Sequence, residues 1–197
     1  MLFIDYLPLL LINMVAGLVL LAGYVYAGME DPDQKKWAPG FIASGAVALV
    51  FGGIIATTWP LPGPYNMLFG ESSVLYGIIF LVAGLTLALG GNLLTIAVYA
   101  FFAGLAAMLM GVRIFVLKLT AFPPLTALGY LATGAAGVLA APGLAWFKGN
   151  KPLRVLVALM ILGAAAVWAL NGFGGYWMHA TGFHDWVPTT HLLLPKK

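Results

Sequence analysis

The sequence contains no cysteine among its 197 residues and carries little charge. Without cysteine there is no disulfide framework, no thiolate metal site and no iron–sulfur cluster. Charged residues make up 8% of the chain, whereas an average soluble domain has about 25%. Hydrophobic residues make up 62%, and the mean hydropathy is +1.01. This composition excludes an ordinary soluble domain and indicates a multi-pass membrane protein.

Six apolar stretches are long enough to cross a hydrocarbon core, which takes about 20 residues of helix. Their continuous apolar character lacks the alternation of a membrane barrel, so each is predicted to be a helix. No long polar linker divides the chain. We therefore predict an all-α integral membrane protein, a bundle of six transmembrane helices in one domain of residues 1–197, with spans at 7–27, 41–59, 73–90, 93–117, 125–147 and 153–178.

The basic residues indicate an orientation. Lysine and arginine cluster at the connections that follow the first and fifth spans, at Lys35, Lys36, Lys148, Lys151 and Arg154, whereas the second connection has none. Because positive charge favours the cytoplasmic side, these connections are predicted to be cytoplasmic and both termini extracytoplasmic. The sequence pI near 9.2 then reflects orientation in the membrane and does not indicate nucleic-acid binding.

The predicted membrane interior lacks the groups that several function classes require. Ion-coupled transporters and pumps place ionisable groups at intramembrane depth, and membrane haem needs histidines within helices. All three histidines of this chain follow the sixth span. We find no nucleophile elbow, phosphate-binding glycine loop or HExxH motif. The sequence therefore disfavours haem, and we expect no enzyme activity.

Polar and aromatic residues gather at the predicted extracytoplasmic face. The connection 59–71 contains three prolines, which make it rigid enough to cap the mouth of the bundle. We predict that this rim binds a partner or a small ligand through Trp59, Tyr65, Asn66, Glu71, Arg113, Lys118, Trp177 and Asp185.

Two of these charged groups have alternative interpretations. Glu71 either caps the third helix, or neutralises Arg113 or binds a cation in the vestibule. Arg113 and Lys118 can instead extend their charged groups toward lipid phosphates. A zinc or copper site is a further hypothesis for Glu71, His179 and His184, because carboxylate and imidazole groups ligate these metals.

Small residues recur at four-residue spacing in the fourth and fifth spans. Ala103, Ala107 and Gly111 form one stripe, and Thr133, Gly137 and Ala141 form the other. Such stripes let two helices approach closely in lipid, so we interpret them as a packing seam. A homo-oligomer or another membrane subunit could use the same surfaces.

The block Trp59-Pro60-Leu61-Pro62-Gly63, with Tyr65-Asn66 and Phe69-Gly70-Glu71 after it, leads into the third span. Together with the length and the six-span layout, it resembles an uncharacterised prokaryotic multi-pass family, domain of unknown function 981. The resemblance covers essentially the whole chain. It implies a protein of the plasma membrane of a bacterium or archaeon, and it implies no catalytic residues.

Three functional hypotheses follow. The first is a non-catalytic membrane protein whose extracytoplasmic rim binds a partner or small ligand, as an accessory subunit of a membrane complex. The second is a transporter or channel for a small solute or ion, using a cavity lined by glycine and alanine. The third is an outward-facing metal-binding protein or metalloenzyme.

Overall fold

The computed structural model describes residues 5–146 and 148–184, and all regular secondary structure within these ranges is helical. The six long helices are all long and apolar enough to cross a membrane, which confirms the six predicted spans. The helix α6 is longer than predicted, because it continues to Gly182 rather than ending near residue 178. The helices are α1 (Tyr6–Tyr26), α2 (Ala38–Thr58), α3 (Ser72–Ala88), α4 (Leu94–Leu117), α5 (Pro123–Trp146) and α6 (Lys151–Gly182).

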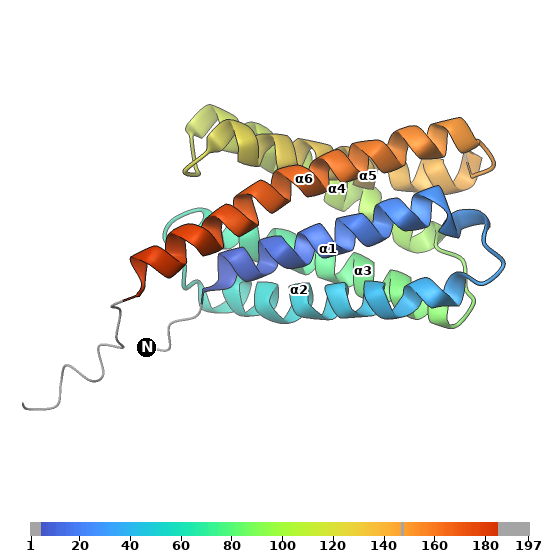
Figure 1. Ribbon diagram of the computed structural model, residues 1–197, viewed down its shortest axis with the longest axis horizontal. Coiled ribbons are helices and arrows are strands. Elements are labelled where there is room, and N and C mark those ends of the chain that lie inside the picture. Colours follow the sequence, from blue (N-terminus) through green and yellow to red (C-terminus); the bar gives the residue numbers. More distant parts are fainter. Residues whose placement is uncertain (1–4, 147, 185–197) are drawn as a thin grey trace, which may run out of the picture.

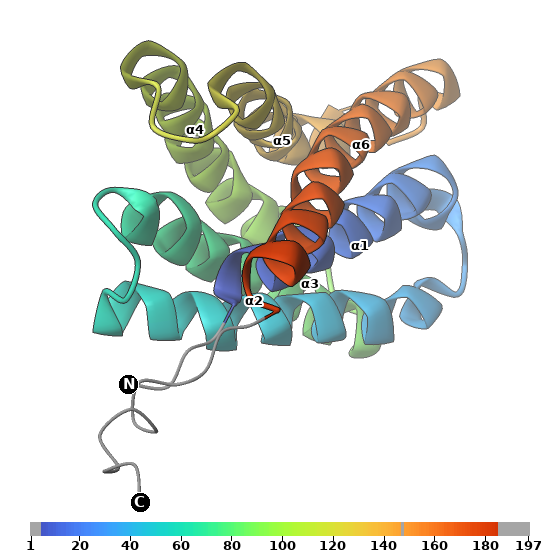
Figure 2. The same ribbon diagram turned by 60° about the vertical axis from the view of Figure 1, so that its left-hand side comes forward.

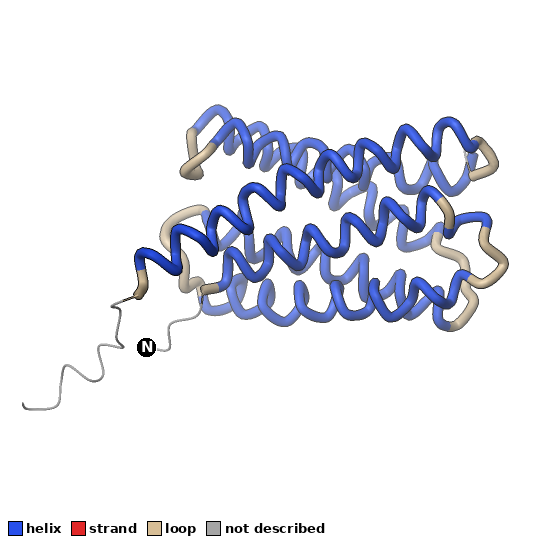
Figure 3. The backbone as a smooth tube through the Cα atoms, viewed as in Figure 1, coloured by secondary structure: helices blue, strands red, loops and turns tan. Residues whose placement is uncertain are grey.

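The helices alternate in direction, so the connections lie at two opposite faces of the bundle (Figures 1 and 3). One face, here called the terminal face, holds the start of α1, the end of α6, and the α2–α3 and α4–α5 connections. The opposite face holds the other three connections. We call it the basic face, because Lys35, Lys36, Lys151 and Arg154 lie there.

The bundle consists of three antiparallel helix pairs. The most extensive contacts join α4 to α5, α2 to α3, and α1 to α6. Figure 2 shows α4 beside α5 and α6 beside α1 as the pairs splay around a common centre. The sequential neighbours α3 and α4 are joined by a short turn but touch much less.

Glycines allow the backbones within two of these pairs to approach closely. A Cβ added at Gly45 of α2 would lie 2.2 Å from the backbone nitrogen of Leu81 in α3. A Cβ added at Gly104 of α4 would lie 2.5 Å from the carbonyl oxygen of Gly134 in α5. Both distances are too short for any other residue, because the obstacle is backbone. Close packing of this kind holds helices together in lipid, where apolar burial gives no driving force.

The seam between α4 and α5 does not follow the two predicted stripes. It uses Gly104 and Gly111 of α4, with Gly134 and Gly137 of α5. Gly111 and Gly137 were predicted, whereas the predicted Ala103, Ala107 and Thr133 line a cavity at the centre of the bundle, which Gly104 and Gly137 also border. Small residues of the two helices thus do form a packing seam between α4 and α5, but only some of them belong to the predicted stripes.

A small polar cluster links three helices within the apolar interior. The Asn13 amide of α1 donates to the carbonyl oxygen of Ser44 in α2 at 2.9 Å. The Ser44 hydroxyl lies 2.7 Å from the hydroxyl of Tyr76 in α3. Gly17 makes room for it, since a Cβ there would overlap the Tyr76 hydroxyl. These hydroxyls therefore fix the arrangement of helices rather than bonding only within their own helix.

Candidate functional site

The three helix pairs border a partly open cavity of about 420 Å³ at the centre of the bundle. All six helices contribute to its wall, which is almost entirely apolar. In the middle of the wall, α4 and α5 contribute small side chains, among them Ala103, Ala107, Ala136 and Ala140. These small side chains leave the space open.

An aromatic cluster lies where the cavity approaches the terminal face. The Tyr130 ring contacts Trp168 edge-on, with ring centroids 5.2 Å apart, and it contacts Phe69 with centroids 6.4 Å apart. The polar atoms of these rings are engaged: the Tyr130 hydroxyl donates to the carbonyl oxygen of Leu68, and Trp168 Nε1 donates to the Thr133 hydroxyl at 2.8 Å. Hydrogen bonds therefore fix the rings at this end of the cavity.

A second aromatic cluster lines the half of the cavity nearer the basic face. Phe80 packs against Tyr76 with centroids 4.2 Å apart and against Phe41 at 5.2 Å, and Phe41 contacts Tyr24 edge-on at 5.8 Å. The Tyr24 hydroxyl donates to the Gln34 side chain at 2.8 Å, which anchors the ring to the α1–α2 connection. The cavity thus lies between two aromatic clusters.

Arg154 is the one residue with a permanent charge among the described residues that line the cavity. It lies in the first turn of α6, and its side chain is only 7% exposed. Its Nη2 group forms an ion pair with Glu30, whose side chain is 48% exposed in the α1–α2 connection. The sequence placed Arg154 at this face as an orientation signal and gave no indication that it is buried.

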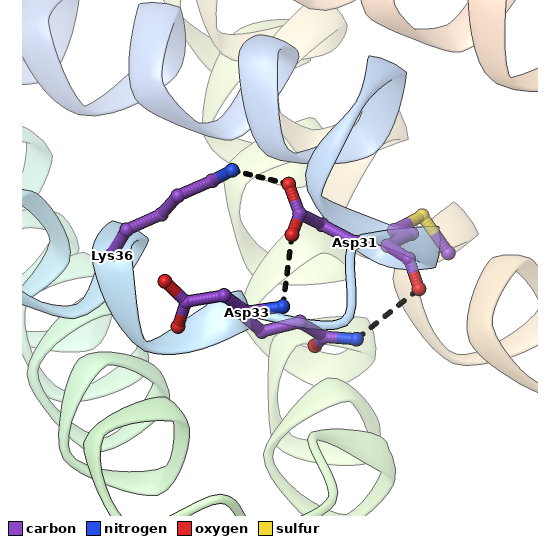
Figure 4. Close-up of polar contacts among 5 residues, drawn as sticks. Asp31, Asp33 and Lys36 are labelled. Carbon is purple, nitrogen blue, oxygen red and sulfur yellow. Dashed lines mark hydrogen bonds and ion pairs between the residues drawn. The ribbon is translucent and has the colours of Figure 1, made fainter.

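The α1–α2 connection that supplies Glu30 is held by its own polar contacts (Figure 4). The Asp31 carboxylate forms an ion pair with Lys36, and it accepts the backbone N–H of Asp33 at 2.9 Å. The Lys36 hydrogen bond, followed by that from Asp33, holds the pKa of Asp31 below the usual 3.8. The Gln34 amide also donates to the carbonyl oxygen of Met29, at 3.3 Å.

The ion pair between Asp31 and Lys36 predicts that the stability of the α1–α2 connection depends on pH. A carboxyl group with a lowered pKa stabilises the folded loop above its ordinary pKa, and this contribution is lost as the pH falls through the ordinary value and then through the folded value. We expect Asp31 in the wild type to titrate below 3.8. In Lys36→Met its pKa should rise back toward that value, whereas Lys35→Met should have much less effect. Carboxyl NMR of the detergent-solubilised protein measures both shifts, and equal pKa values in wild type and Lys36→Met would contradict the assignment.

Most of the predicted rim residues lie at the terminal face. Trp59 ends α2 in the left-handed conformation, with φ 51°, and Lys118 ends α4 in the same way, with φ 53°. Arg113 is exposed in the last turns of α4, and Trp177 of α6 is 81% exposed. Tyr65 is partly buried and packs against Phe69. Asp185 lies outside the described residues.

Asn66 has a different position from the one expected of a ligand-binding residue. Its side chain is fully buried, and it donates to the carbonyl oxygens of Leu61 and Gly63 while its Oδ1 accepts the Leu61 N–H at 2.8 Å. Both ends of the amide are thus used to fold the proline-rich connection. Residues Asn66–Glu71, predicted as loop, form a π-helical segment that continues into α3.

Replacing Asn66 with alanine should therefore loosen the α2–α3 connection. The change leaves the Leu61 N–H and two carbonyl groups without partners, which costs about 1–3 kcal/mol. We expect faster amide hydrogen exchange across residues 59–66 and a lower unfolding temperature. The matched control is Asn92→Ala, which removes an amide that caps only an exposed turn. Unchanged exchange at Leu61 in Asn66→Ala would show that the amide does not hold the loop.

The predicted metal ligands are not brought together. Glu71 is exposed, and within the described part of the chain it makes neither a capping hydrogen bond nor an ion pair with Arg113. His179 instead lies 2.8 Å from the Asp5 carboxylate, and His184 Nδ1 lies 2.9 Å from the Thr181 carbonyl oxygen. Over residues 5–146 and 148–184, no three histidine or acidic side chains form a group suited to a metal ion.

A cavity lined by glycine and alanine was part of the channel hypothesis drawn from the sequence, but its location and its aromatic lining were not predicted. The hydroxyl and indole groups near it come from α1, α3, α5 and α6, at Tyr24, Tyr76, Tyr130 and Trp168. One signal was present: Trp168 and Tyr130 are bulky polar aromatics inside predicted spans, away from the membrane interfaces where such residues concentrate. Only the packing of all six helices shows that they surround one space.

Comparison with known proteins supports both the sequence resemblance and the fold. A family model described as "Protein of unknown function (DUF981)" matches residues 1–182. No curated protein is similar in sequence at a significant level. The fold is similar to that of the Helicobacter pylori urea channel in its closed state, with a TM-score of 0.66 at 17% identity. The match covers 92% of this chain and 100% of that chain, so the two proteins share an architecture over nearly their full length.

Proposed function

The chain belongs to the DUF981 family, and we propose that it forms a passive pathway through its membrane for a small uncharged solute. The observation that supports this most is the cavity between the three helix pairs, about 420 Å³ in volume and bordered by all six helices. Its lining residues extend from Phe69, Tyr130 and Trp168 in the aromatic cluster near the terminal face to Arg154 near the basic face.

The chemistry of the wall favours an uncharged solute over an ion. Burying an unpaired charge in an apolar environment is very costly, whereas a small polar molecule needs only a few hydrogen bonds to replace those it makes with water. The described lining offers apolar surface, several hydroxyl groups and one arginine that is already paired with Glu30. Pore width and hydrogen-bonding groups of this kind set the selectivity of channels for neutral molecules.

The structural neighbour supports the same class of function. That protein is named as a urea channel, and urea is a small neutral solute. Its similarity to this chain is a similarity of fold. The solute for this chain is inferred from the cavity wall and not from the neighbour.

Solute flux into vesicles tests the proposal. Purified protein is reconstituted into liposomes, which are mixed rapidly with an osmotic excess of acetamide, urea or glycerol while light scattering follows their volume. We expect at least one of these solutes to enter protein-containing vesicles several times faster than protein-free vesicles of the same lipid. Equal rates for all three solutes would contradict the proposal.

The orientation in the membrane is part of the proposal. We propose that the basic face is cytoplasmic, because it collects Lys35, Lys36, Lys148, Lys151 and Arg154. Both ends of the chain are then extracytoplasmic. A reporter fused after α6 tests this assignment, since alkaline phosphatase is active outside the cytoplasm and green fluorescent protein inside it.

Docking of a partner at the terminal face remains a second candidate. The exposed indoles of Trp59 and Trp177, together with the exposed charges of Arg113 and Lys118, form the kind of surface that interfaces use. Purification from native membranes in a mild detergent tests it. A co-purifying subunit that is lost in Trp177→Ala would support docking, and a lone protein of native size would argue against it.

A further inference from the structure

Arg154 has hydrogen-bonding capacity that the described protein does not use. The side chain is 7% exposed, and only Nη2 has a partner, the carboxylate of Glu30. Its Nε and Nη1 groups are buried and have no hydrogen-bond partner in the described part of the chain. The same residue borders the cavity at the end near the basic face.

Unused donors of this kind point to an acceptor that enters from the cavity. A buried donor without a partner costs about 1–3 kcal/mol, and more when the group is charged. Met29, Leu153 and Val157, which also line the cavity, are apolar and offer no side-chain oxygen, and the Tyr24 hydroxyl is bonded to Gln34. An oxygen atom carried by a solute can satisfy Nε–H or Nη1–H after a small side-chain movement.

We propose that Arg154 binds the carbonyl oxygen of a small neutral amide at the basic-face end of the cavity. This inference rests on the proposed function, because it names the solute class that the pathway accepts. Arginine has no acceptor atom and always carries its proton, so it recognises the solute only through the solute's oxygen. The site is selective for carbonyl compounds over solutes whose oxygens are hydroxyls, since a carbonyl oxygen is the stronger acceptor.

The Glu30 carboxylate explains why the site should prefer a neutral solute. It balances the guanidinium charge, so the site offers hydrogen-bond donors without a net positive charge. A carboxylate solute would also be repelled by Glu30 and would have to leave water for an apolar cavity. Removing the Glu30 charge should therefore shift preference from the amide to the matching carboxylate.

Binding to the full-length protein in detergent tests the site. Saturation-transfer NMR follows the methyl group of acetamide, with acetate as a charged probe of the same size and ethanol as a slightly smaller hydroxyl probe. We expect wild type to bind acetamide in preference to both, and Arg154→Gln to weaken acetamide binding about tenfold, the effect of losing a charged hydrogen-bond donor. The matched control is Lys151→Gln, which removes an exposed charge three residues earlier in α6 and should leave binding unchanged.

Two further variants keep the test decisive if Arg154→Gln fails to fold. Glu30→Gln retains the guanidinium and should raise acetate binding relative to acetamide several-fold. Arg154→Lys keeps the positive charge but lacks the fixed, planar set of N–H donors of a guanidinium. It should therefore also lose the preference for acetamide over acetate and ethanol. Folded variants at position 154 that bind acetamide like wild type, or an unchanged acetate-to-acetamide ratio in Glu30→Gln, would overturn the inference.

Flux measurements separate this inference from the proposed function. If glycerol enters vesicles at equal rates with wild type and Arg154→Gln, and the wild-type protein does not bind acetamide, the pathway is supported and the arginine site is overturned. Acetamide binding that depends on Arg154, without solute flux, would retain the binding site and overturn the pathway. Faster entry of acetamide than of ethylene glycol in wild type, with that preference lost in Arg154→Gln, supports both.

Discussion

Replacing Ala107 with phenylalanine is expected to reduce solute flux to the rate of protein-free vesicles. Ala107 lies in α4 and lines the cavity, and among the lining residues of α4 it is the one nearest the terminal face. Because Ala107 borders the cavity, the added ring is expected to occupy the space through which a solute would pass. We expect a loss of at least about tenfold, which corresponds to a barrier increase of about 1.4 kcal/mol. Stopped-flow light scattering of reconstituted vesicles measures it.

The matched control lies two residues further along the same helix. Leu109 is 61% exposed on the outer surface of α4, so Leu109→Phe adds a ring to the side that faces lipid. This variant should conduct like wild type. If Ala107→Phe is folded and conducts at the wild-type rate, the cavity is not the pathway.

The second large effect is expected at the seam between α2 and α3. In Gly45→Ala, the new methyl group would lie 2.2 Å from the backbone nitrogen of Leu81 and 2.8 Å from the carbonyl oxygen of Gly77. Since both obstacles are backbone, the two helices must separate, and packing is lost along the pair. We expect the free energy of unfolding to fall by about 3 kcal/mol, the upper part of the usual range for overpacking.

Gly53 of α2 provides the control for this prediction. A Cβ at Gly53 meets no atom within 4 Å, so Gly53→Ala should leave stability unchanged or raise it by about 0.5–1 kcal/mol through the higher helix propensity of alanine. Unfolding in mixed micelles compares the two variants. Equal stability of Gly45→Ala and Gly53→Ala would show that close α2–α3 approach does not support the fold.

The membrane spans could be predicted from the sequence because the bilayer imposes a simple rule. Each apolar run must be a helix of sufficient length, and the short polar connections mark where it ends. The face that each helix turns toward its neighbours was harder to predict. Lipid-facing and helix-facing residues are equally apolar here, so the stripe through Ala103 and Ala107 could not be distinguished from the real seam through Gly104.

The candidate site could be predicted only in part. Hydropathy indicated where ionisable groups lie along the membrane normal, and it placed Arg154 at the correct end of the sixth helix. It could not indicate that this arginine is buried against Glu30, because the two residues are far apart in sequence and meet only when α1 packs against α6. The aromatic clusters were missed for the same reason, since their members come from different helix pairs.

The proline-rich block was expected to form a rigid connection, and the roles of its residues depend on local hydrogen bonds that the expectation did not include. Asn66 looked like an exposed polar group in a loop, whereas its amide folds the loop from within. Glu71 looked like a cap at a helix start, but the helical backbone already begins before it, at Asn66. A π-helical entry to α3 has no strong sequence signal.

The most direct test of the central claim uses the absence of cysteine from the chain. In the variant Ala107→Cys the introduced thiol is the only one, and it can be modified by methanethiosulfonate reagents of increasing size, with the extent of modification measured by mass spectrometry. The account predicts that solute flux in reconstituted vesicles falls as the attached group grows, whereas modification of Leu109→Cys leaves flux unchanged. Complete modification at position 107 with an undiminished rate of solute entry would contradict a pathway through the central cavity.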